Sequence, residues 1–379
     1  MQFTIIGNPQ NRRVILFCRT VTELGYDTPA IISYAGWLSG DIPSSLPKDC
    51  ILKIDSPGED DDVRRMLVAR GLALDGTTDD STTYPAREDF GAIRHMRAWY
   101  RGYCDWLNEA GQVIGTQYPM WVMNTPADIR LQFDKPNCQH WLKKNGIPTP
   151  FTLPPVVCYE DLLDKMRQHR LQKVFIKPAH ASSASGVIAF RKMGAHVQAV
   201  TSTEMIRNTE DIRLYNSLTM RSYTNEREIA ALVDRILQEN AQVEEWLPKA
   251  TLNHRFFDLR VLAIGGKARH TVIRTSRYPI TNLHLGNKRG DMQDFISHIG
   301  GDKLEEVRQL AEKTAACFPD SLYMGIDILL TADLRNIFVL EVNAFGDLLP
   351  GLIDEGETCY EAQVRAMVQR REYDLEHAI

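Results

Sequence analysis

Residues 323–343 read YMGIDILLTADLRNIFVLEVN, and this stretch carries the strongest fold signal in the chain. Two apolar runs flank turn residues at 333–336, which predicts two antiparallel strands joined by a tight turn. Asp327 lies in the first strand, and Glu341 and Asn343 lie at the end of the second. Residues two apart in a strand face the same side of the sheet. Glu341 and Asn343 are therefore expected to point the same way, with Asp327 beside them.

A carboxylate inside strands this apolar is costly unless a cation pairs with it or a metal binds it. Asp327, Glu341 and Asn343 together offer only oxygen ligands, a set that suits Mg²⁺ and not Zn²⁺. These three residues are therefore the predicted metal ligands. A single ion pair at the edge of a sheet is the alternative interpretation.

A second candidate feature begins at Lys177, which follows an apolar strand at 174–176. The loop at 181–187 reads ASSASGV and consists of small residues. Such a loop lets backbone N–H groups approach a phosphate closely, and the ammonium group supplies a point charge. The loop is not a Walker A loop, because no Gly-Lys-Ser/Thr follows it. A solvated lysine at a strand end is the alternative.

The chain between these two features adds a connector and a group of arginines. The connector at 243–248 reads VEEWLP, and in an extended form it can present backbone N–H and C=O groups to an adenine edge. A linker between two domains, with no contact to adenine, would have the same sequence pattern. The arginines are Arg255, Arg260, Arg269, Arg274 and Arg277. Arg260 and Arg274 can contact a phosphate or a substrate carboxylate, although a solvated strand face is the alternative.

The composition is that of an ordinary globular protein. The chain has 379 residues, 44% hydrophobic and 25% charged, which is enough for two or three domains. With 44 Lys and Arg against 49 Asp and Glu, the net charge is −5, so nucleic acid is not an expected partner. No apolar run approaches the ~20 residues of a membrane helix, and the start does not resemble a signal peptide. Seven scattered cysteines without a Cys-x-x-Cys pair favour a reducing compartment, so a cytoplasmic protein is expected.

Residues 1–120 alternate between short apolar strands and amphipathic helices, which predicts a parallel α/β layer. Gly7 opens no Gly-x-Gly-x-x-Gly motif, so the layer lacks a dinucleotide-binding fingerprint. After this region the pattern changes, and a helix is expected at 127–145, ending before Gly146.

Taken in order, these features resemble the ATP-grasp superfamily, in particular RimK-like carboxylate–amine ligases and their glutathione-synthetase relatives. The resemblance covers roughly residues 121–352. It implies an α/β protein in which an N-terminal Rossmann-like, pre-ATP-grasp domain (1–120) precedes a two-lobed α+β ATP-grasp module. The first lobe (121–243) would carry the phosphate loop, and the second lobe (244–379) would carry the metal site.

The resemblance also implies roles for individual residues, with ATP and Mg²⁺ or Mn²⁺ as cofactors. Lys135 and Lys177 are similar to the family's two nucleotide-binding lysines, and Asp327, Glu341 and Asn343 to its metal ligands. The phosphate loop would contain Ser182, Ser183, Ser185 and Gly186, and the adenine hinge would contain Glu245, Trp246 and Leu247. The acid near the ribose would be Asp258, and the segment that contacts the triphosphate would contain Thr281 and Asn282. The implied catalytic residues are Arg260, Arg274 and Asn282.

The chain departs from the family pattern in several places. The phosphate loop has a single glycine and follows His180, and Lys249 stands where an acid commonly follows the hinge. The stretch 246–258 is a few residues longer than in RimK-like enzymes. After the metal strand, Ser-Pro-Gly is replaced by AFGDLLP at 344–350. The opening IGNPQNRR at 6–13 resembles that of a bacterial subfamily of STM-type RimK relatives.

The resemblance implies an ATP-dependent ligase. A substrate carboxylate would attack the γ-phosphate to give an acylphosphate and ADP, and an amine or thiol would then displace phosphate. The carboxylate could belong to a small molecule, a peptide or a protein, and His284 would lie near the acceptor. Members of the family are often dimers or tetramers, so the resemblance is compatible with a homo-oligomer. Two other functions stay open, a phosphotransferase acting on a small alcohol and a non-catalytic nucleotide-binding partner protein.

Overall fold

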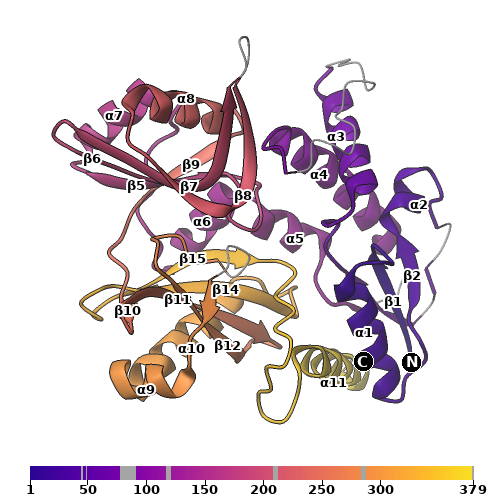
Figure 1. Cartoon of the computed structure of the whole chain (residues 1–379). Coiled ribbons are helices and arrows are strands. Elements are labelled where there is room, and N and C mark those ends of the chain that lie inside the picture. The colour runs from indigo at the N-terminus through magenta and orange to yellow at the C-terminus, as the bar shows by residue number, and fades with distance from the viewer. Residues whose placement is uncertain are drawn as a thin grey trace.

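The structure is a computed structural model that describes residues 1–43, 46–47, 49–76, 91–116, 121–207, 212–282 and 287–377. The described residues form sheets of four, five and six strands. Figure 1 shows the five-stranded sheet above the six-stranded one, with the four-stranded sheet of the N-terminal region to one side. Within the described ranges, no helix combines the length and the apolar character needed to cross a membrane.

The four-stranded sheet is parallel, with the order β2-β1-β3-β4. Its strands are β1 (Gln2–Gly7), β2 (Ala30–Ser33), β3 (Cys50–Ile54) and β4 (Trp121–Val122). The helices that connect them are α1 (Arg12–Glu23), α2 (Tyr34–Leu38), α3 (Asp61–Leu74) and α4 (Met96–Gly115). Parallel strands need such crossovers, so the strand–helix alternation in the sequence predicted this layer correctly. The sheet extends to β4, just past residue 120.

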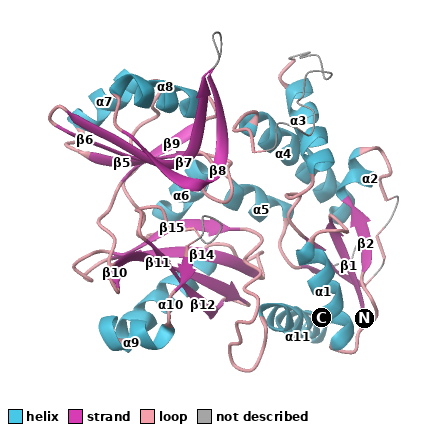
Figure 2. Ribbon diagram, viewed as in Figure 1, coloured by secondary structure: helices cyan, strands magenta, loops and turns pink. Residues whose placement is uncertain are grey.

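The five-stranded sheet is antiparallel, with the order β8-β7-β6-β5-β9. Its strands are β5 (Lys173–Pro178), β6 (Ile188–Met193), β7 (His196–Arg207), β8 (Ile212–Tyr223) and β9 (Ala241–Glu245). Helices α7 (Tyr159–Gln168) and α8 (Glu226–Leu237) cover its outer face (Figure 2). The buried stripe of α8, with residues such as Ile229, Leu232 and Ile236, packs on the sheet at helical spacing.

The helix predicted at 127–145 is divided into α5 (Pro126–Phe133) and α6 (Lys135–Lys144). Asp134 breaks it, since its backbone is extended (φ −89°, ψ 96°) and its carboxylate accepts a hydrogen bond from the N–H of Asn137. Pro136 fits the first turn of the new helix, where its missing N–H costs nothing. The break makes Lys135 the first residue of α6.

The six-stranded sheet has the order β13-β12-β11-β14-β15, and β10 pairs with β11. Its strands are β10 (Thr251–Leu252), β11 (Arg255–Ile264), β12 (Lys267–Ser276), β13 (Lys288–Arg289), β14 (Tyr323–Leu330) and β15 (Ile337–Asn343). Helices α9 (Met292–Ile299) and α10 (Gly301–Ala315) cover the face away from the five-stranded sheet (Figure 1). The two strands predicted around 333–336 are thus β14 and β15, and their antiparallel pairing is confirmed. These sheets and the N-terminal layer confirm the predicted fold class.

The last helix, α11 (Cys359–His377), returns to the N-terminal layer and lies beside α1 (Figure 1). Tyr360 packs edge-to-face on Phe17, with ring centroids 5.7 Å apart. Arg371 near its end forms an ion pair with Asp49, at 2.7 Å. The chain beyond residue 358 therefore packs on the N-terminal layer as well as on the six-stranded sheet, where α11 contacts β11.

Helices α3 and α4 pack closely through Gly71 and Gly102. A Cβ atom on Gly102 would lie 2.0 Å from the carbonyl oxygen of Leu67. We expect Gly102→Ala to lower the free energy of unfolding by at least about 1–3 kcal/mol, the usual cost of overpacking. Gly115→Ala, at the end of the same helix where nothing lies within 4 Å, is the matched control and should be neutral. Urea unfolding measures both variants, and equal midpoints would contradict the close packing.

Candidate active site

A cleft of about 870 Å³, counted to its open mouth, lies between the five-stranded and six-stranded sheets. Strands β5, β9, β11, β12, β14 and β15 and the start of α6 contribute to its lining. Most of the predicted site residues meet there: Lys135, Lys177, Ser183, Glu245, Leu247, Asp258, Arg260, Arg274, Thr281, Asn282, Asp327, Glu341 and Asn343. Segment 283–286, which includes His284, lies outside the described residues.

Lys177 forms an ion pair with Glu244, whereas the sequence predicted a role for its neighbour Glu245. Glu244 is only 1% exposed. In the β5–β9 register it lies opposite Phe175, which places it on the same face of the sheet as Lys177. The two-residue alternation of β9, taken with that of β5, could have identified Glu244.

Lys135 reaches the cleft from the first turn of α6. Its Nζ atom lies 3.2 Å from Oε1 of Glu341, and it also donates to the carbonyl oxygen of Ala181, just before the phosphate loop. A predicted nucleotide lysine therefore contacts both a predicted metal ligand and the base of the loop.

Side chains of alternating charge cross the floor of the cleft. Nε of Arg274 lies 2.7 Å from Oδ1 of Asp258, and its Nη2 lies 3.0 Å from Oδ2 of Asp327. Arg260 donates to both oxygens of Asp327 and lies 3.0 Å from Oδ2 of Asp347. Burial alone would raise the pKa of Asp258 and of Asp327, but the neighbouring cations lower both below the usual range. Both carboxylates are therefore ionised in the folded protein.

Asp258 lines the cleft, and side chains of the protein surround its carboxylate, so its contact with a ribose stays a prediction. Besides Arg274, it accepts hydrogen bonds from Thr281 and from Lys249, whose Nζ lies 2.9 Å away. The carboxylate is 1% exposed, so its two oxygens are occupied by side chains. Burial lowers the pKa of Lys249, and Asp258 opposes that effect. Lys249, a departure from the family pattern, is thus a partner of Asp258, which anchors three side chains.

The three predicted metal ligands lie on neighbouring strands. Asp327 is directly opposite Glu341, and Gly325 is opposite Asn343. The amide nitrogen of Asn343 donates to the carbonyl oxygen of Gly325 at 3.2 Å, which leaves the amide oxygen as a ligand atom. Two carboxylates and an amide oxygen fit a hard divalent cation, which would share Asp327 with the two arginines. Over the described ranges, no three His, Cys, Asp or Glu side chains lie together in a way that could hold a metal ion.

The predicted phosphate loop is built from tight turns. Ser183 and Ala184 line the cleft and have left-handed backbones, with φ of 54° and 58°. The N–H of Ser185 donates to the carbonyl oxygen of Ser182 at 3.0 Å. Gly186 has a φ of 73°, and a Cβ there would lie 2.8 Å from the proline that ends β5. Ser182, Ser185 and Gly186 shape the loop without lining the cleft, so their contact with a nucleotide stays a prediction.

The residues of the predicted adenine hinge also face in two directions. Glu245 and Leu247 line the cleft. Trp246, between them, packs on Phe175 with ring centroids 5.2 Å apart, and it does not line the cleft. Trp246 is therefore a packing residue in this structure.

A contact that the sequence did not predict holds the base of the phosphate loop. His180 stacks on Tyr100 of α4, with ring centroids 3.8 Å apart and an interplanar angle of 8°. Its Nε2 lies 3.4 Å from a carboxylate oxygen of Asp134. Burial lowers the pKa of His180, which favours the neutral imidazole. These residues come from distant segments, so no local pattern could have joined them.

Two antiparallel sheets around a cleft lined by lysines and by oxygen-bearing side chains are the arrangement of the ATP-grasp fold. The crystal structure of D-cycloserine synthetase DcsG aligns with a TM-score of 0.56 and 11% identity over 98% of this chain and 99% of that chain. The ATP-grasp ligase PsnB, complexed with a phosphomimetic precursor variant, Mg and ADP, aligns with a TM-score of 0.50 and 16% identity over 98% of this chain and 99% of that chain. At these identities the likeness concerns the fold.

A family model described as YheC/D-like ATP-grasp matches residues 128–354, and the chain therefore belongs to that family. The coenzyme gamma-F420-2:alpha-L-glutamate ligase of Methanocaldococcus jannaschii is 28% identical over 223 residues, which are 59% of this chain and 61% of the relative. The match thus spans less than two thirds of the relative's length. The predicted ATP-grasp superfamily is confirmed, and the RimK-like placement stays a prediction.

The lowered pKa values of Asp258 and Asp327 predict a loss of stability in acid. Both lie below the ordinary 3.8 in the folded protein, so the unfolded chain takes up protons first as the pH falls. Their contribution is complete well above that ordinary value, begins to be lost as the pH approaches it, and is fully lost only as the pH falls through the lower pKa values of the folded state. Urea unfolding between about pH 6 and pH 3 should show this decline, with a shallower slope for Asp258→Asn. The exposed substitution Asp27→Asn is the control, and a slope that Asp258→Asn left unchanged would contradict the prediction.

Proposed function

We propose that this chain is an ATP-dependent carboxylate–amine ligase that acts through an acylphosphate and releases ADP and phosphate. The observation that carries the proposal is the convergence of Lys135, Lys177 and the oxygen ligands of β14 and β15 in one cleft. Membership of an ATP-grasp family supports it, as does a curated relative named as a ligase. The nucleotide would lie between a lobe formed by 121–243 and a lobe formed by 244–379, with 1–120 as the preceding domain.

The cleft offers different surfaces to the two ends of ATP. Phe175, Leu247 and Ile280 provide apolar lining for an adenine ring, and the hinge backbone provides hydrogen-bonding groups. Lys135 and Lys177 provide ammonium groups for the phosphates. Each lysine is paired with a carboxylate, so a triphosphate would compete with those carboxylates for the two cations.

Asp327, Glu341 and Asn343 are the residues we propose for Mg²⁺, with Mn²⁺ as an alternative for the same oxygen ligands. When bound, the ion would neutralise the β- and γ-phosphate oxygens of ATP. The PsnB structure, which contains Mg and ADP, supports this pairing of cofactors. If Glu341 bound the ion, it would no longer pair with Lys135. The ammonium group of Lys135 would then be free to bind a phosphate.

The reaction needs no side-chain nucleophile. A substrate carboxylate oxygen attacks the γ-phosphorus and ADP leaves, and an amine or thiol then attacks the acyl carbon and phosphate leaves. Arg260 and Arg274 would stabilise the negative charge that develops on the acyl oxygen in the tetrahedral intermediate. Burial opposes the charge on Arg274, but Asp258 and Asp327 raise its pKa, so the guanidinium stays charged. Carboxylates hold both arginines in place before the reaction begins.

The relatives support a nucleophile of amino-acid or peptide type. One is named as a glutamate ligase, and PsnB is complexed with a precursor peptide. We propose the amine of an amino acid or peptide as the nucleophile. The carboxylate would come from a small molecule, a peptide or a protein.

We expect this chain to release ADP from Mg²⁺·ATP with at least one pair drawn from a panel of amino acids and short peptides. Glu341→Ala should lower the rate by at least about 100-fold, because it removes a ligand from the phosphate-neutralising ion. Glu23→Ala, whose side chain is exposed on α1, is the control and should retain the wild-type rate. A coupled ADP assay measures the rate, and mass spectrometry identifies the product.

The products separate this proposal from its rivals. A ligase releases phosphate only when the amine is present, whereas a phosphotransferase leaves the phosphate on an alcohol. ATP binding without ADP formation across the whole panel would favour a non-catalytic nucleotide-binding protein. Wild-type turnover by Glu341→Ala would overturn the metal assignment.

A further inference from the structure

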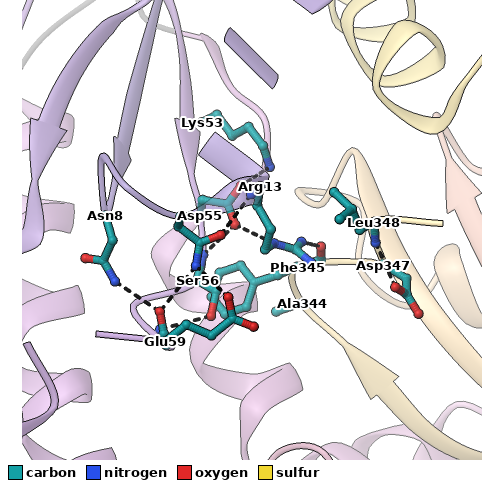
Figure 3. A network of polar contacts seen from close by, with 12 residues as sticks. Asn8, Arg13, Lys53, Asp55, Ser56, Glu59, Ala344, Phe345, Asp347 and Leu348 are labelled. Atoms are coloured by element: carbon teal, nitrogen blue, oxygen red, sulfur yellow. Dashed lines mark hydrogen bonds and ion pairs between the residues drawn. The ribbon is translucent and has the colours of Figure 1, made fainter. Parts of the chain in front are cut away.

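A buried ionic network lies where the N-terminal layer meets the six-stranded sheet (Figure 3). Lys53 of β3 and Asp55, just after that strand, are 0% and 1% exposed. Nζ of Lys53 lies 3.2 Å from Oδ2 of Asp55, and Nε of Arg13 in α1 lies 2.9 Å from Oδ1 of Asp55. Burying ions is costly, and apolar side chains often stabilise such an interface at least as well. A contribution to stability alone therefore does not explain why these charged side chains are buried here.

The network contacts β14 and the turn that follows β15, the two strands that carry the proposed metal ligands. Nη2 of Arg13 donates to the carbonyl oxygen of Phe345, two residues after Asn343 (Figure 3). Nζ of Lys53 donates to the hydroxyl of Tyr323, at the start of β14. Asn124 donates to the carbonyl oxygens of Tyr323 and Ala344, both at 2.8 Å. The ends of β14 and β15 are thus held from the N-terminal side.

Arg13 belongs to the opening sequence IGNPQNRR, which the proposed function leaves without a role. Other residues of that sequence fix the surroundings of Arg13. Asn8 donates to the carbonyl oxygens of Pro57 at 3.1 Å and Gly58 at 3.0 Å. Asn11 caps α1 by accepting a hydrogen bond from the N–H of Arg13 at 2.8 Å. The opening sequence thus builds a rigid base for the Arg13 side chain.

The segment that Arg13 holds also connects to an arginine of the cleft. The N–H of Gly346 donates to the carbonyl oxygen of Asn343 at 3.0 Å, which forms a turn around Phe345. One residue further on, Asp347 lies 3.0 Å from Nη1 of Arg260. A shift of the Phe345 carbonyl would therefore move a proposed metal ligand on one side and the partner of Arg260 on the other.

We propose that Arg13, oriented by Asp55, is a positioning residue that holds the turn at 343–347 and so sets the place of the Asn343 ligand oxygen. The inference rests on the proposed function, because it requires that Asn343 bind the ion that accompanies ATP. Asp55 neutralises Arg13, and the forked guanidinium reaches Asp55 and the Phe345 carbonyl at once. A lysine at position 13 could satisfy Asp55 but would lack the second arm of the fork.

The test measures ATP affinity by isothermal titration, with Mg²⁺ and with EDTA, for the full chain and three variants. Mg²⁺ should raise the ATP affinity of the wild type, and we expect this gain to be about 10-fold smaller in Arg13→Gln. A roughly 10-fold effect is the lower end of the usual effect of residues that orient metal ligands. Its affinity in EDTA should equal that of the wild type. Arg13→Lys, which keeps a cation beside Asp55, should lose a smaller part of the Mg²⁺-dependent gain. Arg12→Gln, an exposed substitution at the adjacent position, should behave like the wild type.

The outcomes separate the possibilities. An Arg13→Gln variant with the full Mg²⁺-dependent gain would overturn the proposal, and so would an equal loss with and without Mg²⁺, which indicates a purely structural role. If Arg13→Gln does not fold, the Arg13→Lys variant decides by the same comparison. The wild-type titration alone reports on the proposed function, and if Mg²⁺ adds nothing to its ATP affinity, both proposals fail.

Discussion

Everything in the cleft depends on four side chains of alternating charge, Asp258, Arg274, Asp327 and Arg260. The strand register sets their order, because Asp258 lies opposite Arg274 and Arg260 lies opposite Asp327. Removing one partner from such a buried set leaves an uncompensated charge, which typically costs about 3–5 kcal/mol. The electrostatics of the site therefore depend on the pairing of β11 with β12 and β14. The floor of the cleft can present arginines only while the sheet keeps its register.

The other parts of the molecule attach to this floor through further ion pairs and through hydrogen bonds from the same cations. Lys135 brings α6 and the base of the phosphate loop to Glu341, and Arg13 joins the N-terminal layer to the turn after β15. Lys177 and Glu244 form the corresponding pair on the five-stranded sheet. Cations paired with carboxylates in this way can exchange partners when a polyanion enters. In the proposed ATP site, such pairs would stabilise the fold while ATP is absent, and the same cations could bind its phosphate groups when ATP enters.

The sequence predicted those features that repeat locally. Apolar runs around 333–336 located β14 and β15, and oxygen-bearing residues within them stood out because buried carboxylates need partners. What it did not predict depends on distant contacts. The stack of His180 on Tyr100, the environment of Asp258 and the packing of α11 on α1 leave no periodic trace. The break before Lys135 was visible in the Asp-Lys-Pro sequence, but the hydrophobic pattern continued across it and favoured a single helix.

The central claim is that two lysines and three oxygen ligands act on a single triphosphate. A crystal structure with Mg²⁺ and a non-hydrolysable ATP analogue tests it most directly. Our account predicts the phosphates between Lys135 and Lys177, with the ion bound to Asp327, Glu341 and Asn343. An analogue bound elsewhere, or phosphates that leave both lysines in their present ion pairs, would contradict it.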